Sequence, residues 1–143
     1  MKYPNRSGRL PANSSGFSLL EMLAVIVLIG IVAGIVVNKV GDNVTRGKWN
    51  AGKAQVAKLS MQVESYALDN GGPPSNLDDL VKKPSNAPNW KTGYARENDL
   101  KDPFGHPFGY HAPGEHGDFD IVFYGKDGKQ GGDEYNADYG NWQ

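Results

Sequence analysis

Hydrophobic and polar positions divide the chain into three stretches of different character. Residues 22–37 are all apolar or glycine, and with the residues just before them they approach the roughly 20 residues that a helix needs to cross a bilayer. Apolar residues then recur at helical spacing to about residue 70, and residues 73–143 carry short apolar runs between glycines and prolines. The pattern predicts a membrane-spanning helix, its amphipathic continuation and a small globular domain.

The amphipathic stretch carries an apolar stripe made of Val56, Leu59, Val63 and Tyr66. These residues are spaced at i, i+3, i+7 and i+10, which puts them on one face of a helix. The helical pattern ends at the glycines and prolines of residues 71–74, because these residues terminate helices. We expect the stripe to pack against the globular domain.

The globular part has the composition of a small α+β layer. We expect a short helix begun by Asn76 over residues 77–81, strands at residues 108–111 and 119–124, and a hairpin connection at residues 113–117. A small antiparallel sheet packed on the amphipathic helix is the natural two-layer arrangement.

The charges are unevenly distributed, although the formal net charge is only −1. Basic residues predominate between residues 39 and 63, whereas from Glu64 onward acids outnumber bases about two to one. This segregation favours contacts between an acidic head and a basic helix of another subunit, and a solvated surface would show it equally. There is no cysteine, so disulfides and thiol chemistry are excluded, and an exported domain would need another source of rigidity, such as a metal.

Glu21 is the only charged residue within the apolar run. A charged side chain at the centre of a bilayer costs about 2.5–3.5 kcal/mol on insertion scales, so it needs a partner or a shallow position. Glu21 lies near the start of the expected helix, where the helix end is electropositive. The residues alone leave open an interfacial glutamate of an ordinary signal anchor and a carboxylate that has a partner.

Residues 124–139 form a glycine-rich segment whose acids are Asp127, Asp133, Glu134 and Asp138. Closely spaced carboxylates and free backbone carbonyls are what Ca²⁺ prefers, with about six to eight oxygens around the ion. The spacing is not that of an EF-hand, because Lys129 and Gly131 occupy positions where acids are expected. On the residues alone, a calcium loop and a solvated acidic turn both remain open.

His106, His111 and His116 recur every five residues, but they have no cysteine partners and not the spacing of known zinc sites. We interpret them as surface histidines. Asp118 and Asp120 alternate with apolar neighbours, which is typical of the solvent face of a strand. No GxSxG, phosphate-binding loop or HExxH motif occurs, so we expect no enzyme, and we expect no nucleic acid among the partners.

The segment Gly16-Phe17-Ser18-Leu19-Leu20-Glu21, which follows a short basic leader and precedes the apolar run, resembles the class III signal of type IV pilins. The resemblance implies that a prepilin peptidase cleaves between Gly16 and Phe17 and methylates the new Phe17 amine. It also implies that Glu21 pairs with the terminal amine of a neighbouring subunit. A conventional secretory signal competes, but its apolar core would span about 7–15 residues and end at a small-x-small site, which residues 38–42 do not offer.

From Tyr66 onward the chain resembles the major pseudopilin of type II secretion systems, the G class. The resemblance rests on segments in the same order: residues 66–71 (YALDNG), 101–105 (KDPFG), 113–117 (PGEHG), 127–128 (DG) and 137–142 (ADYGNW). It implies a calcium ion in the acidic loop, bound by Asp127, Asp138, the backbone carbonyl of Tyr124 and, as a further candidate, Asp133. Ordinary type IV pilins usually close a C-terminal loop with a disulfide, which a chain without cysteine cannot form.

Together these features predict a pilin-like α+β fold, in which a long N-terminal helix packs against a small antiparallel sheet with a calcium-binding C-terminal loop. The expected parts are a cleaved leader at residues 1–16, a transmembrane and assembly helix at 17–37, an amphipathic helix at 38–72 and a periplasmic globular domain at 73–143.

The resemblance implies a non-enzymatic major pseudopilin, anchored in the bacterial inner membrane by one helix. It would polymerise with itself into a pseudopilus that drives export of folded proteins across the outer membrane, and a separate ATPase would supply the energy. The implied partners are the minor pseudopilins, the inner-membrane proteins of the secretion machinery and the prepilin peptidase. A type IV pilin of a surface pilus is the structural alternative, and a monomeric, membrane-anchored calcium-binding module is the alternative of a different class.

Overall fold

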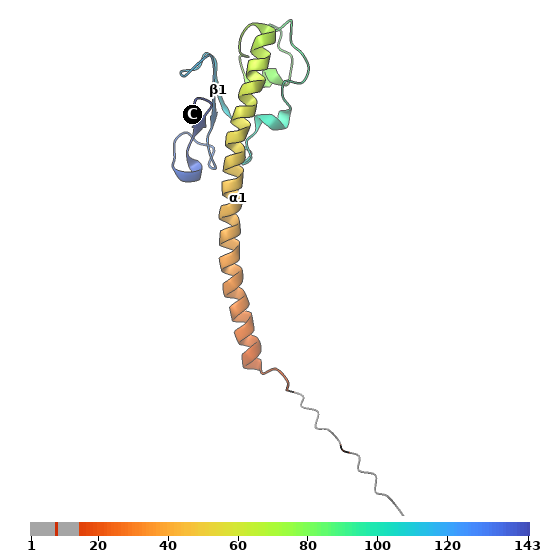
Figure 1. The fold of residues 1–143 in the computed structure, drawn as a ribbon, viewed down its shortest axis with the longest axis vertical. Helices are drawn as coiled ribbons and strands as arrows, with labels where there is room; N and C mark the ends of the chain where they lie inside the picture. Colours follow the sequence, from red (N-terminus) through yellow and green to blue (C-terminus); the bar gives the residue numbers. More distant parts are fainter. Residues whose placement is uncertain (1–7, 9–14) are drawn as a thin grey trace, which may run out of the picture. The chain divides into compact units, whose positions relative to one another are not determined.

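The computed structural model describes Gly8 and residues 15–143. It consists of two compact units, Met1–Lys39 and Val40–Gln143. Helix α1 (Leu19–Asn70) contributes residues to both units, and the strands all belong to the second (Figure 1).

Helix α1 begins with a reciprocal pair of hydrogen bonds between Ser18 and Glu21. The Ser18 N–H donates to Glu21 Oε2 at 2.9 Å, and the Glu21 N–H donates to Ser18 Oγ at 3.1 Å. This is the arrangement of a capping box, which gives partners to backbone donors that a helix start leaves unpaired. The serine therefore defines where the helix begins.

The first part of α1 is apolar on all sides and is not buried by its own chain. Its most apolar window of 18 residues has a mean hydropathy of 2.9, and 0% of that window is buried. A helix that is hydrophobic all round needs an apolar environment, and this run is long enough to cross a bilayer. The structure therefore confirms a long apolar helix suited to a membrane anchor.

The second part of α1 buries the apolar stripe that the sequence predicts. Val56, Leu59, Val63 and Tyr66 are each no more than 4% exposed. They share one hydrophobic cluster with residues of the loops and strands, namely Leu77, Leu80, Ala87, Ala95, Phe108, Ile121 and Phe123. The prediction that the stripe packs against the globular part is confirmed.

Three short antiparallel strands form one sheet in the order β1 (Gly109–His111), β2 (Asp120–Phe123) and β3 (Tyr139–Gly140). Tyr110 pairs with Ile121 between the first two strands, and Phe123 pairs with Tyr139 between the last two. Strands β1 and β2 confirm the expected hairpin. Strand β3 has no counterpart among the expected elements, because two residues are too few to show an alternating pattern.

The segment between α1 and the sheet is held in place by specific polar contacts. Asn76 and Asp79 form a capping box at the start of a 3-10 helix, which confirms the short helix expected there. The Tyr94 hydroxyl donates to Asp69 Oδ2 at 2.6 Å and so fastens this segment to the end of α1. The 3-10 helices of the chain are η1 (Leu77–Leu80), η2 (Glu97–Leu100) and η3 (Glu134–Asn136).

Candidate functional site

The residues predicted for processing lie just before α1. The expected leader is outside the described residues, except for Gly8, Ser15 and Gly16. Gly16 and Phe17 are exposed and belong to no helix or strand, and Phe17 is 84% exposed. Cleavage between them would therefore require no unfolding of a described element.

Glu21 lies one turn after this bond, and its carboxylate is directed back toward the start of the helix. This direction is fixed by the hydrogen bond that Glu21 Oε2 accepts from the Ser18 N–H at 2.9 Å. Ser18 is the residue directly after Phe17. Cleavage after Gly16 would make the Phe17 nitrogen a free amine. The Glu21 carboxylate is therefore held next to the residue that would carry this amine.

The acidic loop, residues 124–138, connects β2 to β3. Its two ends are held together by the pairing of Phe123 with Tyr139, and within it the Lys126 N–H donates to the Tyr135 carbonyl at 2.7 Å. Gly125 has a φ of 67°, and a Cβ there would lie 2.7 Å from the Tyr135 carbonyl oxygen. Only glycine fits this turn without strain, so the loop can adopt this backbone conformation because Gly125 is a glycine.

The predicted calcium ligands are held in different ways along this loop. Asp138 Oδ2 accepts a hydrogen bond from the Gly131 N–H at 2.8 Å, whereas Asp138 Oδ1 is buried without a hydrogen-bond partner. Asp127 is exposed, and its Oδ1 accepts from the Lys129 N–H at 3.2 Å. Asp133 is exposed and precedes η3 without a side-chain capping bond.

These donors fit a hard cation in part. A buried carboxylate oxygen without a partner is costly, and a cation at Asp138 Oδ1 would remove that cost. Among residues 15–143, however, no three His, Cys, Asp or Glu side chains are grouped closely enough to hold a metal ion. The carboxylates of Asp127, Asp133 and Asp138 are therefore not gathered into one cluster. A calcium ion here would take much of its coordination from backbone carbonyls, such as that of Tyr124, and from water.

Aromatic contacts attach the acidic loop to α1. The Tyr135 ring meets the Trp49 ring edge-on, with 6.4 Å between centroids. The Lys53 ammonium lies 4.3 Å from the Trp49 ring and 5.5 Å from the Tyr139 ring, close enough for cation–π attraction to both. The position of the loop is therefore tied to the helix.

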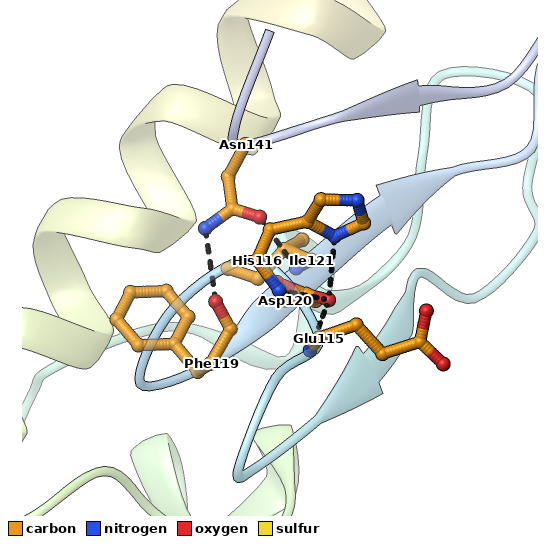
Figure 2. Close-up of polar contacts among 6 residues, drawn as sticks. All are labelled: Glu115, His116, Phe119, Asp120, Ile121 and Asn141. Atoms are coloured by element: carbon orange, nitrogen blue, oxygen red, sulfur yellow. Dashed lines mark hydrogen bonds and ion pairs between the residues drawn. The ribbon is translucent and has the colours of Figure 1, made fainter.

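Asp120 is buried, which contradicts the expectation that it faces solvent. It is 4% exposed, and its carboxylate accepts from the Glu115 N–H at 2.8 Å and lies 3.0 Å from His116 Nδ1 (Figure 2). Burial alone would raise the pKa of the Asp120 carboxyl, but the hydrogen bonds from His116 and Glu115 together lower it. Alternation along the strand could not show that the hairpin connection folds back over this side chain and supplies its donors.

His116 and Asn141 fasten the C-terminal residues to the same hairpin. The His116 ring stacks on the Trp142 ring, with 3.8 Å between centroids and 5° between planes. Asn141 Oδ1 accepts from the Ile121 N–H at 2.9 Å, and Asn141 Nδ2 donates to the Phe119 carbonyl at 3.3 Å (Figure 2). His116 thus lies at the surface as expected, but its ring is held between Asp120 and Trp142. The sequence offers only a weak signal for this cluster, namely a histidine four residues before an aspartate across a glycine turn.

Two parts of the chain match known families. Residues 39–142 match the family described as type II secretion system (T2SS), protein G. Residues 11–37 match the prokaryotic N-terminal methylation motif. The first match covers more than half of the chain, and the second contains the bond between Gly16 and Phe17.

Similar proteins extend along nearly the whole chain. It is 42% identical over 135 residues to the type II secretion system core protein G of Xanthomonas campestris pv. campestris, covering 94% of this chain and 91% of that protein. The protein of the same name from Pseudomonas aeruginosa is 41% identical over 135 residues, covering 90% and 94%. The crystal structure of the major pseudopilin from the type 2 secretion system of enterohaemorrhagic Escherichia coli is similar, with a TM-score of 0.57 and 30% identity, over 71% of this chain and 91% of that one. The chain therefore belongs to the type II secretion system protein G family and is a type II secretion pseudopilin.

Proposed function

We propose that this pseudopilin is the major subunit of a periplasmic pseudopilus whose growth helps to move folded proteins across the outer membrane. The observation that carries the proposal is the apolar part of α1, of which 0% is buried by its own chain. In the inner membrane, lipid covers such a helix. A subunit that leaves the bilayer to join a fibre needs a second apolar environment, and the same helices of neighbouring copies supply it.

The segment before α1 supports processing by a prepilin peptidase. Cleavage between Gly16 and Phe17 would remove the leader and create a new amine on Phe17, which the same enzyme would methylate. The match of residues 11–37 to a methylation motif supports this step. The Glu21 carboxylate, held toward the helix start by Ser18, is then available to the Phe17 amine of a neighbouring subunit. Such a pair neutralises a charge that is costly within an apolar fibre core.

Calcium binding by the acidic loop is the second part of the proposal. The ion would be held by the backbone carbonyl of Tyr124 and by the carboxylates of Asp127, Asp133 and Asp138. The support is the buried Asp138 Oδ1, which has no hydrogen-bond partner, together with the glycine turns that shape the loop. The ion would act as a structural clamp in a segment that has few apolar side chains and no disulfide.

The division of the chain supports a location at the inner membrane, with the globular unit in the periplasm. In this arrangement the partners are further copies of the chain, minor pseudopilins, inner-membrane components of the secretion machinery and the prepilin peptidase. The work of the subunit is mechanical rather than enzymatic. Energy for fibre growth would come from a separate cytoplasmic ATPase.

Deletion of the gene tests the proposal against its closest alternative, a type IV pilin of a surface pilus. We expect the deletion to block release of folded exoproteins and to trap them in the periplasm, while surface pili and twitching motility persist. Loss of surface pili with normal exoprotein release would contradict the proposal. A strain complemented with the wild-type gene provides the control for effects on neighbouring genes.

A further inference from the structure

We propose that the stack of Trp142 on His116 positions the acidic loop for its cation, so that these two side chains set the calcium affinity of the loop without touching the ion. The inference rests on the calcium site proposed above. It concerns side chains outside the loop, which neither the sequence pattern nor the family resemblance marked as functional.

The acidic loop is closed at its C-terminal end by a very short strand. Strand β3 follows Asp138 directly and has only two residues, Tyr139 and Gly140. So short a strand contributes little pairing energy by itself, because isolated short strands are marginal in water. Any movement of β3 away from β2 would carry Asp138 with it. The geometry of the ion site therefore depends on what holds β3 in place.

The residues just beyond β3 hold this strand against β2. The Asn141 N–H donates to the Ile121 carbonyl at 3.1 Å, and Asn141 Oδ1 accepts from the Ile121 N–H at 2.9 Å. The Trp142 ring then folds back over Gly140, where any Cβ would overlap the ring. Trp142 thus covers the last residue of β3, and its ring also stacks in parallel on the ring of His116.

His116 is itself anchored to β2. Its Nδ1 lies 3.0 Å from Oδ2 of Asp120, whose carboxylate is buried under the hairpin connection. The stack therefore connects β3 to a fixed point on β2. One cavity of about 260 Å³ is lined by both rings of the stack and by Asp120 and Asp138. The stack therefore lies beside Asp138, a proposed ligand of the ion.

The stack of Trp142 on His116 lies outside the main hydrophobic core. The Trp142 residue is 41% exposed and the His116 side chain is 42% exposed. Neither belongs to the hydrophobic cluster that holds the sheet to α1. Removal of the Trp142 ring should therefore leave the fold intact while loosening the end of the acidic loop, which separates a positioning role from a general structural one.

The test measures calcium binding to the full processed chain in detergent micelles, by titration calorimetry with calcium chloride. We expect Trp142→Ala and His116→Ala each to weaken calcium binding about tenfold, as loss of a residue that supports a metal ligand commonly does. For Trp142→Ala the thermal midpoint in chelator should stay near that of wild type. For His116→Ala it should fall in calcium and in chelator alike, because this substitution also removes the contact of His116 Nδ1 with the buried Asp120 carboxylate. Trp142→Phe should restore most of the affinity, because a phenyl ring can still stack.

Two further variants sharpen the result. The double variant of Trp142→Ala and His116→Ala should bind calcium no more weakly than either single variant, because the two residues act as one unit. Trp90→Phe is the matched control: it removes the hydrogen bond from Trp90 Nε1 to the Asp79 carbonyl at 2.7 Å. It should lower the thermal midpoint in calcium and in chelator alike and leave the calcium affinity unchanged.

The outcomes distinguish this inference from the calcium proposal on which it rests. If the wild-type chain binds no calcium, both are wrong. If wild type binds calcium and the Trp142 and His116 variants bind it equally well, only the positioning role is wrong. A loss of affinity in Trp142→Ala that is accompanied by a similarly lowered midpoint in chelator would also overturn it, because that result indicates general destabilisation.

Discussion

The ring of Phe123 lies directly against the backbone of Gly52. A Cβ built on Gly52 would lie 2.5 Å from Phe123 Cζ, which is too close for any real contact. Phe123 is fully buried and stacks on Phe104 with 6.3 Å between centroids, so its ring has little room to withdraw. The glycine is therefore what allows β2 to approach α1 as closely as it does.

Gly52→Ala should destabilise the globular unit even though alanine favours helix formation. The clash with Phe123 should cost about 1–3 kcal/mol, and because the ring is fully buried we expect this cost to exceed the gain of about 1 kcal/mol in helix propensity. Urea denaturation followed by circular dichroism measures the difference. Gly47→Ala is the matched control, because a Cβ there meets nothing within 4 Å, and it should be neutral or stabilising. Equal stabilisation by both substitutions would contradict the close approach.

Asp120→Ala should also destabilise the globular unit, because it leaves two backbone donors of the hairpin connection without their acceptor. Hydrogen bonds to a charged group are worth about 1.5–3 kcal/mol, and the carboxylate accepts from the backbone of Glu115 and His116. Denaturation at neutral pH measures the loss. Asp118→Ala, at an exposed position on the same hairpin, should change stability little. A result in which the two variants are equally stable would show that Asp120 is not the anchor.

The same carboxyl gives the stability a pH dependence of known sign. The hydrogen bonds that offset its burial lower the pKa of Asp120 in the folded protein, so the unfolded chain binds more protons in acid. The stability that Asp120 contributes is therefore fully present above its unfolded pKa of about 3.9 and is lost as the pH falls through the folded pKa. Lys91 lowers the pKa of Asp69, and Lys58 lowers the pKa of Asp99. These two carboxyl groups therefore also contribute stability that is lost as the pH falls.

The contribution of Asp120 can be isolated by comparing wild type with Asp120→Asn across the acid range. The difference in unfolding free energy between the two proteins should shrink as the pH falls below about 4. A difference that stays constant or grows in acid would mean that the folded state does not favour the ionised form.

The large elements follow from patterns that extend over many residues. The run of apolar residues and the stripe of Val56, Leu59, Val63 and Tyr66 predict α1 and its buried face, because each pattern repeats over several turns. The capping residue Asn76 likewise marks its 3-10 helix. The first two strands are recognisable for the same reason, since turn residues bound their apolar runs.

The cluster around Asp120 could not be predicted in this way. Its contacts join residues of the hairpin connection to a strand and to the C-terminal segment, as with Trp142 on His116. Local patterns report which face of an element a side chain occupies, but not which distant segment covers that face. The buried state of Asp120 and the strand β3 both depend on such coverage, so they become visible only in the folded structure.

The role of the acidic loop is tested by comparing Asp127→Ala and Asp138→Ala in calcium and in chelator. In saturating calcium both variants should lose stability relative to wild type, because each removes a proposed ligand. In chelator Asp127→Ala should change little, since that side chain is exposed. Asp138→Ala should cost less in chelator than in calcium, because without the ion one of its oxygens is buried and unpaired.

Thermal unfolding of the full chain in detergent provides the measurement for the loop variants. Glu115→Ala, an exposed acid outside the loop, is the control for a general change in charge. Equal losses in calcium and in chelator for both loop variants would show that the ligand assignment is wrong.

The central claim is that the chain acts as an assembly subunit through α1, with Glu21 as the carboxylate that assembly requires. Removal of one partner of a buried ion pair costs about 3–5 kcal/mol, and the loss recurs at every subunit added to a fibre. In a membrane, by contrast, Glu21→Ala removes a charge from an apolar run, so insertion should be unimpaired or improved.

The most direct measurement is therefore fibre formation by Glu21→Ala in a strain that lacks the wild-type gene. Fibres released by opening the outer membrane are quantified by immunoblotting and electron microscopy, and membrane fractionation of the same cells measures insertion. Asp42→Ala, which removes the next acid along the exposed surface of α1, is the control. We expect Glu21→Ala to be inserted in the membrane and to form no fibres, while Asp42→Ala forms them normally. Fibres of wild-type abundance from Glu21→Ala would contradict the account.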